Sequence, residues 1–388
     1  MPFDIKTFSN KLMRYRNQFP VSIEEVSSST GISISRLRDL ENGQNEPSGD
    51  EILILADFFK CDFNYFISNE KETVLEKTEL LFRRYGKELS TNDRWAIQEC
   101  IFFAESENYL DELYSIKKPQ VFQFNPVGSY FKQQGIDAAI ELRKVLNYRA
   151  NEFRLDIYSE FRKAGFLIYR RKLENSSISG VCIAHPQIGK IILVNYDEDI
   201  YRQRFTVAHE VGHAIFDSED GDIELSFIGK WDKDFLKEVR ANNFAASFLI
   251  PYELIFSIPN NKKWDGEKII EWANKVKVNT KSLLIALKNN GLITDSQEEE
   301  LSIYKIPSDI KMDPEYSDFS QEMLERLTIL LERGLTYKYI NKCFKAQRDN
   351  KISMERMFEM MFIEHNQFCD INNLLNPGKP PPLAVVMS

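Results

Sequence analysis

Two histidines four positions apart, with a glutamate directly after the first, give HEVGH at residues 209–213. On a helix, His209 and His213 lie one turn apart on the same face, so both imidazoles can bind one metal ion. Glu210 is offset by about 100 degrees, which keeps it out of the coordination shell but close to a water beside the ion. Zinc lowers the pKa of such a water to about 7, and a carboxylate can take its proton as it attacks a carbonyl. The spacing therefore predicts metal-assisted peptide hydrolysis.

A third ligand is predicted in EVRANNFAASFLIP, which begins with Glu238, 25 residues after His213. On a helix, Glu238 and Asn242 share a face, so the carboxylate can bind the metal while the amide orients a ligating imidazole. This completes a His2Glu site with one position open for water. By itself Glu238 would be an ordinary carboxylate near a helix start, and it is the HEVGH partner that favours the ligand role.

The rest of the HEVGH helix is apolar, which predicts that it is buried and that its histidines have partners. Gly212 costs a helix about 1 kcal/mol relative to alanine, which indicates that another segment approaches its backbone closely. Two alternatives stay open. The helix could be a core helix with satisfied histidines, or the site could no longer cut, since a motif does not demonstrate turnover.

The paired segments RFTVAHEVGHAIF and EVRANNFAASFLIP, with IILVN ahead of them, resemble the ImmA/IrrE family of zinc-dependent metallopeptidases over residues 140–295. The resemblance implies a zincin-like α+β fold of the HExxH (gluzincin-like) type, with His209, His213 and Glu238 as metal ligands and Glu210 as general base. Zinc suits these ligands best, and Mn2+ or Fe2+ would accept them too. Arg240 departs from the family, in which many members carry an acidic or amide residue. It could lower the metal affinity or touch the substrate.

The N-terminal segment predicts short helices joined by glycine turns. In SIEEVSSSTGISISRLRDLENG, one helix precedes Gly31 and a second starts near Ser33 and ends at Gly43, while Ser48 caps the next. This arrangement resembles the Cro/repressor-like (XRE) helix-turn-helix domains, whose second helix lies in the DNA major groove. The resemblance implies that Ser33, Ile34, Ser35, Arg36 and Asp39 face the groove and that Arg38 can reach a phosphate or a base edge.

The charge of this segment is unusual for a DNA-binding domain. Residues 1–69 hold seven Lys or Arg against ten Asp or Glu, a balance of 7 − 10 = −3. A helical module for dimerisation or protein contact is therefore the alternative. The whole chain has a net charge of −9, which argues against non-specific coating of nucleic acid and leaves only local DNA contact.

The predicted fold is multidomain and mainly helical, with one α+β domain. Short apolar segments at 166–173, 179–186 and 190–196 predict strands, and the acidic DSEDGDIE (217–224) is interpreted as a solvated loop. The predicted divisions are a helix-turn-helix domain (1–70), a helical connector (71–116), a linker (117–133), the metallopeptidase domain (134–295), a helical C-terminal region (296–375) and a proline-rich tail (376–388).

No apolar run approaches the roughly 20 residues that cross a bilayer, and the N-terminus does not resemble a signal peptide, so a cytoplasmic location without membrane contact is expected. Two functional hypotheses follow. The first is a DNA-binding zinc metalloendopeptidase, conditionally active, that cleaves a partner protein such as a transcriptional repressor. The second is a non-proteolytic XRE-type regulator, or the antitoxin of a toxin–antitoxin or phage-defence pair, with a sensory or structural metal site. Either way, the expected partners are a DNA operator, a protein substrate, cognate repressor or toxin, and a second copy of the chain.

Overall fold

A computed structural model of the chain describes residues 3–69, 89–217, 223–227, 235–313, 321–364, 367–368 and 371–372. The chain divides into two compact units. Unit 1 comprises Met1–Lys117, Lys172–Asn175 and Glu325–Ser388, and unit 2 comprises Lys118–Arg171 and Ser176–Leu324. Within the described ranges, no helix is long and apolar enough to cross a membrane.

Unit 1 begins with five short helices whose starts are set by polar caps. Ser22 and Ser48 each form a capping box with the glutamate three residues later. Gly31 ends the second helix with a φ of 73°, a left-handed conformation that favours glycine. The five helices are α1 (Ile5–Gln18), α2 (Ile23–Thr30), α3 (Ile34–Glu41), α4 (Gly49–Phe58) and α5 (Phe63–Ile67). The predicted helix-turn-helix is therefore formed by α2 and α3.

The remaining helices of unit 1 come from two distant parts of the sequence. Among the described residues they are α7 (Thr91–Leu113), α17 (Tyr337–Arg348), α18 (Met354–Met361) and the larger part of α16 (Gln321–Glu332), whose first residues belong to unit 2. Lys342 on α17 pairs with Glu107 at 2.7 Å and Asp111 at 2.6 Å on α7, and Phe19 stacks on Trp95 with ring centroids 3.9 Å apart. The C-terminal helices thus pack in the same unit as the helix-turn-helix.

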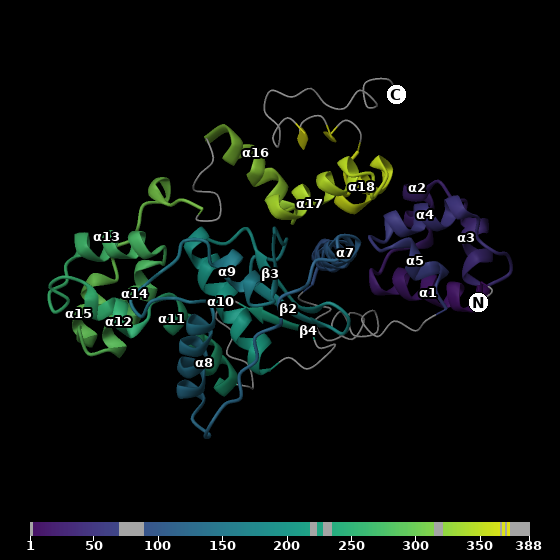
Figure 1. The fold of residues 1–388 in the computed structure, drawn as a ribbon. Coiled ribbons are helices and arrows are strands. Elements are labelled where there is room, and N and C mark those ends of the chain that lie inside the picture. Colours follow the sequence, from purple (N-terminus) through teal and green to yellow (C-terminus); the bar gives the residue numbers. More distant parts are fainter. Residues whose placement is uncertain are drawn as a thin grey trace. The chain divides into compact units, whose positions relative to one another are not determined.

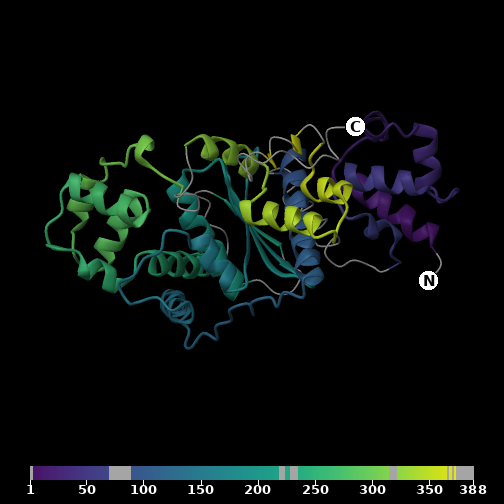
Figure 2. The ribbon, with the colours of Figure 1, turned by 45° about the horizontal axis from the view of Figure 1, so that its top comes forward.

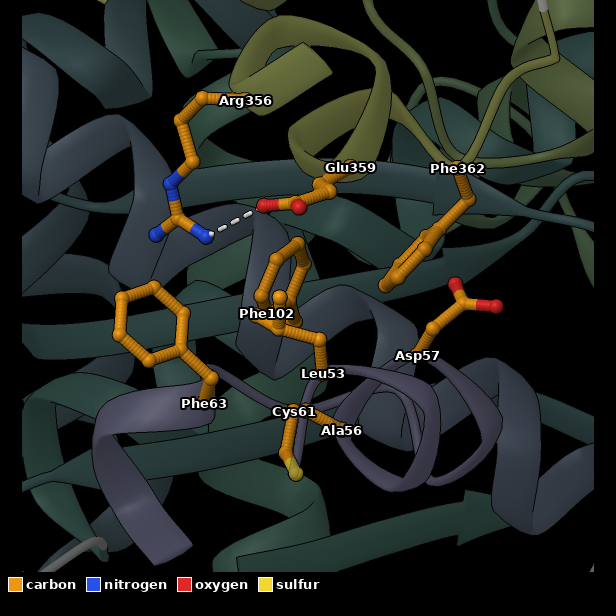
Figure 3. A pocket seen from close by; sticks show the side chains of 9 residues that line it. All are labelled: Leu53, Ala56, Asp57, Cys61, Phe63, Phe102, Arg356, Glu359 and Phe362. Carbon is orange, nitrogen blue, oxygen red and sulfur yellow. Dashed lines mark hydrogen bonds and ion pairs between the residues drawn. The ribbon is translucent and has the colours of Figure 1, made fainter. Parts of the chain in front are cut away.

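A small pocket in unit 1 lies where α4 and α5 face α7 and α18 (Figure 3). Its charged side chains are already paired: Arg356 with Asp62 and with Glu359, and Asp57 with Lys60. The pocket therefore lies between helices that ion pairs already hold together.

Unit 2 is built around a four-stranded sheet in the order β1-β3-β2-β4. The strands are β1 (Leu167–Arg171), β2 (Ile178–His185), β3 (Gly189–Asn195) and β4 (Ile223–Phe227). β1 runs parallel to β3, and the β2–β3 and β2–β4 pairs are antiparallel. Every residue of β2 is buried, so the sheet is covered on both faces, and β2 and β3 read as continuous apolar runs.

Helices cover this sheet and continue beyond it (Figures 1 and 2). The long helix α10 lies against β2 and β3 and packs on α11, which in turn packs on α8. The helices are α8 (Phe131–Val145), α9 (Ile157–Lys163), α10 (Ile200–Phe216), α11 (Phe235–Leu249), α12 (Tyr252–Ser257), α13 (Gly266–Val276), α14 (Thr280–Asn289) and α15 (Asp295–Leu301), with a 3-10 turn η1 at Ser308–Ile310.

The predicted class, mainly helical with one α+β domain, is confirmed. Three strands lie where they were predicted, but β4 was not predicted and begins inside the segment interpreted as a solvated loop. Residues 134–165 form two helices with a break between them. Residues 71–88 of the predicted connector (71–116) and the proline-rich tail (376–388) lie outside the described residues. The predicted domain boundaries stay predictions.

Candidate metal centre

The HEVGH motif lies in the C-terminal half of α10. Asp199 starts this helix by accepting hydrogen bonds from the backbone amides of Tyr201 and Arg202. His209 is 9% exposed, His213 5% and Glu210 0%. As predicted from its apolar residues, the helix is buried, and its polar side chains therefore need partners inside the protein.

Those partners come from α11. Nε2 of His209 and Nε2 of His213 lie 3.0 Å apart, and Glu238 approaches them with one oxygen 3.2 Å from His213 Nε2 and the other 3.4 Å from His209 Nε2. Tetrahedral zinc with ligand bonds of about 2 Å needs its ligand atoms about 3.3 Å apart. These three side chains fit the ion because their donor atoms have both the spacing and the chemistry it requires.

A glycine sets the crossing of α10 and α11. A Cβ at Gly212 would lie 3.0 Å from Cα of Ala241 and 3.3 Å from its Cβ. The close approach predicted from this glycine is therefore confirmed, and the approaching segment is the helix that carries Glu238. Any larger residue at 212 must move that helix or distort it.

The carboxylate of Glu210 packs against strand β2. A Cβ at Gly180 would lie 2.8 Å from both Cγ and Oε1 of Glu210, so the carboxylate occupies space that only glycine leaves open. This contact was not predicted, because Gly180 is 30 residues away in the sequence and carries no chemistry itself.

The hydrogen bond that orients a histidine comes from an unpredicted residue. Nδ1 of His213 lies 3.0 Å from Oδ2 of Asp217, whose side chain is 1% exposed. At Nδ1 of His213 this role belongs to Asp217, and the role predicted for Asn242, orienting a ligating imidazole, stays a prediction. Asp217 begins the segment interpreted as solvated, and its i,i+4 spacing from His213 was the available signal.

Comparison with known proteins assigns both parts of the chain. Residues 161–288 match the IrrE N-terminal-like domain, and residues 12–66 match a helix-turn-helix domain. The chain joins an XRE-type helix-turn-helix to an IrrE-type peptidase domain. "Radiation response metalloprotease IrrE" of Deinococcus deserti is 34% identical over 100 residues, 25% of this chain and 35% of that protein. The protein of the same name from Deinococcus radiodurans is 34% identical over 100 residues, 25% of this chain and 30% of its own length. The match spans about a third of these relatives.

The electrostatics of the candidate centre favour a positive charge at His213, which lies between the carboxylates of Asp217 and Glu238. Burial lowers the pKa of His213, but hydrogen bonds to Asp217 and Glu238 outweigh burial and raise this pKa to about 10. Burial raises the pKa of Glu238, yet the hydrogen bonds to both histidines outweigh it and hold this pKa well below its usual range. Both shifts have one cause, the close packing of imidazoles against buried carboxylates.

In the helix-turn-helix domain, the predicted DNA-contacting residues are not equally available. Ser33 caps α3 by accepting from the backbone N–H of Arg36, and Ser35 is exposed beside it. The Arg36 guanidinium pairs with both carboxylate oxygens of Glu51, at 2.7 and 2.8 Å. Arg38 is exposed and forms no ion pair with the described residues, whereas Ile34 and Asp39 are half-buried. Arg38 is thus the cation of α3 that faces solvent.

Proposed function

We propose that this chain is a DNA-binding regulatory metalloendopeptidase that cleaves a partner protein. One observation supports the proposal most directly. The ligand atoms of His209, His213 and Glu238 all lie within 4.8 Å of one another, close enough to bind one ion, and Glu210 is buried beside them. A divalent ion held there, most suitably zinc, would polarise the scissile carbonyl and acidify water. Mn2+ and Fe2+ are the other candidates for these ligands.

Glu210 is proposed as the general base. Its carboxylate would take a proton from the attacking water and return it to the leaving amine. Burial against β2 removes water from around the carboxylate and, with the contact at Gly180, limits the positions it can adopt. One side chain can then serve both proton transfers without a large movement.

The Glu210→Gln variant tests this role. It keeps the size of the side chain and all three proposed ligands, so bound zinc measured by mass spectrometry should equal that of the unchanged chain. As the test substrate we choose the protein encoded by the adjacent gene, because the substrate is a proposed partner protein, and its cleavage should fall by roughly 10²- to 10⁴-fold. Full cleavage by a zinc-loaded Glu210→Gln protein would rule out Glu210 as the base. A wild-type chain that binds zinc but leaves this protein intact would count against it as the substrate.

The second candidate is a regulator that binds an operator and does not cut. The exposed, unpaired position of Arg38 on α3 favours DNA contact through this helix. An Arg38→Ala variant should bind operator DNA more weakly and lower the salt dependence of binding by about one counterion, because one phosphate contact is lost. Arg36→Ala should mainly lower the stability of the domain by about 0.5 kcal/mol, since Arg36 is paired with Glu51.

Fluorescence anisotropy against salt concentration measures both variants. If Arg38→Ala binds the operator as the unchanged chain does at every salt concentration, the proposed DNA contact through α3 is wrong. Homodimerisation on paired half-sites, the cytoplasmic location and a toxin–antitoxin or phage-defence role stay predictions.

A further inference from the structure

A chain of buried polar contacts runs from the candidate metal centre to helix α8. Asp217 accepts from His213 through Oδ2 and pairs with Arg240 through Oδ1. The other end of the Arg240 guanidinium donates to Oε1 of Gln134 at 3.0 Å, and Gln134 donates through Nε2 to the carbonyl of Gly128 at 2.7 Å. The chain links α10, α11 and α8.

The Arg240 guanidinium also contacts aromatic rings, in addition to its hydrogen bonds with Asp217 and Gln134. It lies 4.6 Å from the ring centroid of Phe131 and 4.3 Å from that of Phe216. The residue is 8% exposed. A planar, permanently charged group suits this position, because it can stack between two rings and bond at both ends, which an ammonium group cannot do.

The close packing of α8 on α11 brings Gln134 within hydrogen-bonding distance of Arg240. A Cβ at Gly135 would lie 2.3 Å from the carbonyl oxygen of Arg240, so the two helix backbones touch beside Gln134. Gln134 is 6% exposed. The contact of the two helices therefore places the Gln134 amide next to the Arg240 guanidinium, inside the protein and away from solvent.

We propose that Arg240 is a positioning residue, fixed by Gln134, that locks Asp217 so that His213 presents Nε2 to the metal. This inference rests on the proposed metal site. The Asp217 side chain is 1% exposed and bonds Arg240 through Oδ1, so the guanidinium fixes the direction in which Oδ2 faces His213. With Nδ1 of His213 donating to Asp217, Nε2 would be the nitrogen left to bind a metal ion. Arg240 therefore supports metal affinity without touching either metal or substrate.

On charge alone, Arg240 would lower the metal affinity, because a nearby cation repels a metal ion. The pairing of Arg240 with Asp217 favours the opposite effect, a higher metal affinity. Arg240 bonds Oδ1 of Asp217, so removing the arginine takes away the group that fixes this buried side chain. Asp217 can then turn away from Nδ1 of His213, and the metal affinity falls.

The test measures the Zn2+ affinity of the full chain by competition with a chromophoric chelator. Arg240→Met should weaken zinc binding by about tenfold, in the range found for residues that orient metal ligands. Arg240→Lys keeps the charge but cannot bond Asp217 and Gln134 at the same time. Its zinc affinity should lie between those of the unchanged chain and Arg240→Met. Gln134→Leu should weaken binding less than Arg240→Met, since it removes only the outer contact.

Arg143→Met is the matched control. Arg143 is another buried arginine of unit 2, 5% exposed, which donates to the backbone carbonyls of Phe248 and Glu152. Its loss should lower the unfolding temperature of the zinc-free protein while leaving zinc affinity within about twofold, because no residue of the proposed centre contacts it. A merely structural role for Arg240 would give the same pattern.

A double-mutant cycle identifies the route of the effect. In an Asp217→Asn background, Arg240→Met should cause no further loss of zinc affinity, since Arg240 acts through Asp217. Equal zinc affinity in Arg240→Met and the unchanged chain, or full additivity with Asp217→Asn, would overturn the inference. Failure of the unchanged chain to bind zinc would instead refute the metal centre itself, so the two failures are distinguishable.

Discussion

At the scale of single residues, the candidate centre depends on a residue without a side chain, Gly180, as well as on the residues with donor atoms. His209, His213 and Glu238 are the proposed ligands, but the orientation of Glu210, the proposed base, depends on the missing side chain of Gly180. Catalytic rates fall steeply when a reacting group moves by about 1 Å. The position of Glu210 is therefore as important as its identity.

Gly180→Ala should separate placement of the base from metal binding. Its Cβ would lie 2.8 Å from Glu210 Cγ, so the carboxylate must shift, and cleavage should fall by roughly 10²-fold while zinc binding changes little. Gly49→Ala is the control, since a Cβ there meets nothing within 4 Å. Cleavage and zinc content are measured on both variants. Unchanged cleavage by Gly180→Ala would show that Glu210 is not held by this contact.

At the scale of elements, the site is assembled by three packed helices and one strand. α10 carries two proposed ligands and the base, α11 carries the third ligand and Arg240, and α8 carries Gln134. Small residues at both crossings, Gly212 between α10 and α11 and Gly135 between α8 and α11, let the backbones approach. The spacing of the donor atoms is therefore a property of helix packing.

Gly135→Ala should disturb this packing. Its Cβ would clash with the Arg240 carbonyl oxygen, so α8 and α11 must separate, and the free energy of unfolding should fall by about 1–3 kcal/mol. Zinc affinity should fall as well, because α11 carries Glu238. Gln133→Ala, at an exposed neighbouring position of α8, should change stability by only a few tenths of a kcal/mol. Urea unfolding and chelator competition measure both. A Gly135→Ala protein as stable as the unchanged chain would contradict this account of the crossing.

At the scale of the whole molecule, unit 2, which carries the proposed metal centre, is inserted in the sequence of unit 1. Unit 1 includes α17 and α18, which follow unit 2 in the sequence and pack on α7. The two units are thus joined by more than one passage of the chain. Separating them at one point of the sequence would leave unit 1 without part of its core.

Metal should stabilise the whole chain by binding only its folded form. At a free zinc concentration about 100 times the dissociation constant, the gain in unfolding free energy should be about 2.7 kcal/mol, and a chelator should remove it. Glu238→Gln should lose most of this gain, because one of three proposed ligands becomes a neutral amide. Scanning calorimetry with and without zinc measures the effect. Equal stabilisation of Glu238→Gln would exclude Glu238 as a ligand.

The sequence by itself determined what local geometry controls. The i,i+4 spacing of His209 and His213 and the capping of the short N-terminal helices follow from the repeat of the helix and from nearby side chains. Only the tertiary structure decided which distant groups meet. It brought Gly180 to Glu210, paired Arg36 with Glu51, and paired Asp217 with Arg240. These pairings depend on the packing of whole elements, and residues far apart in the sequence carry no spacing that reveals them.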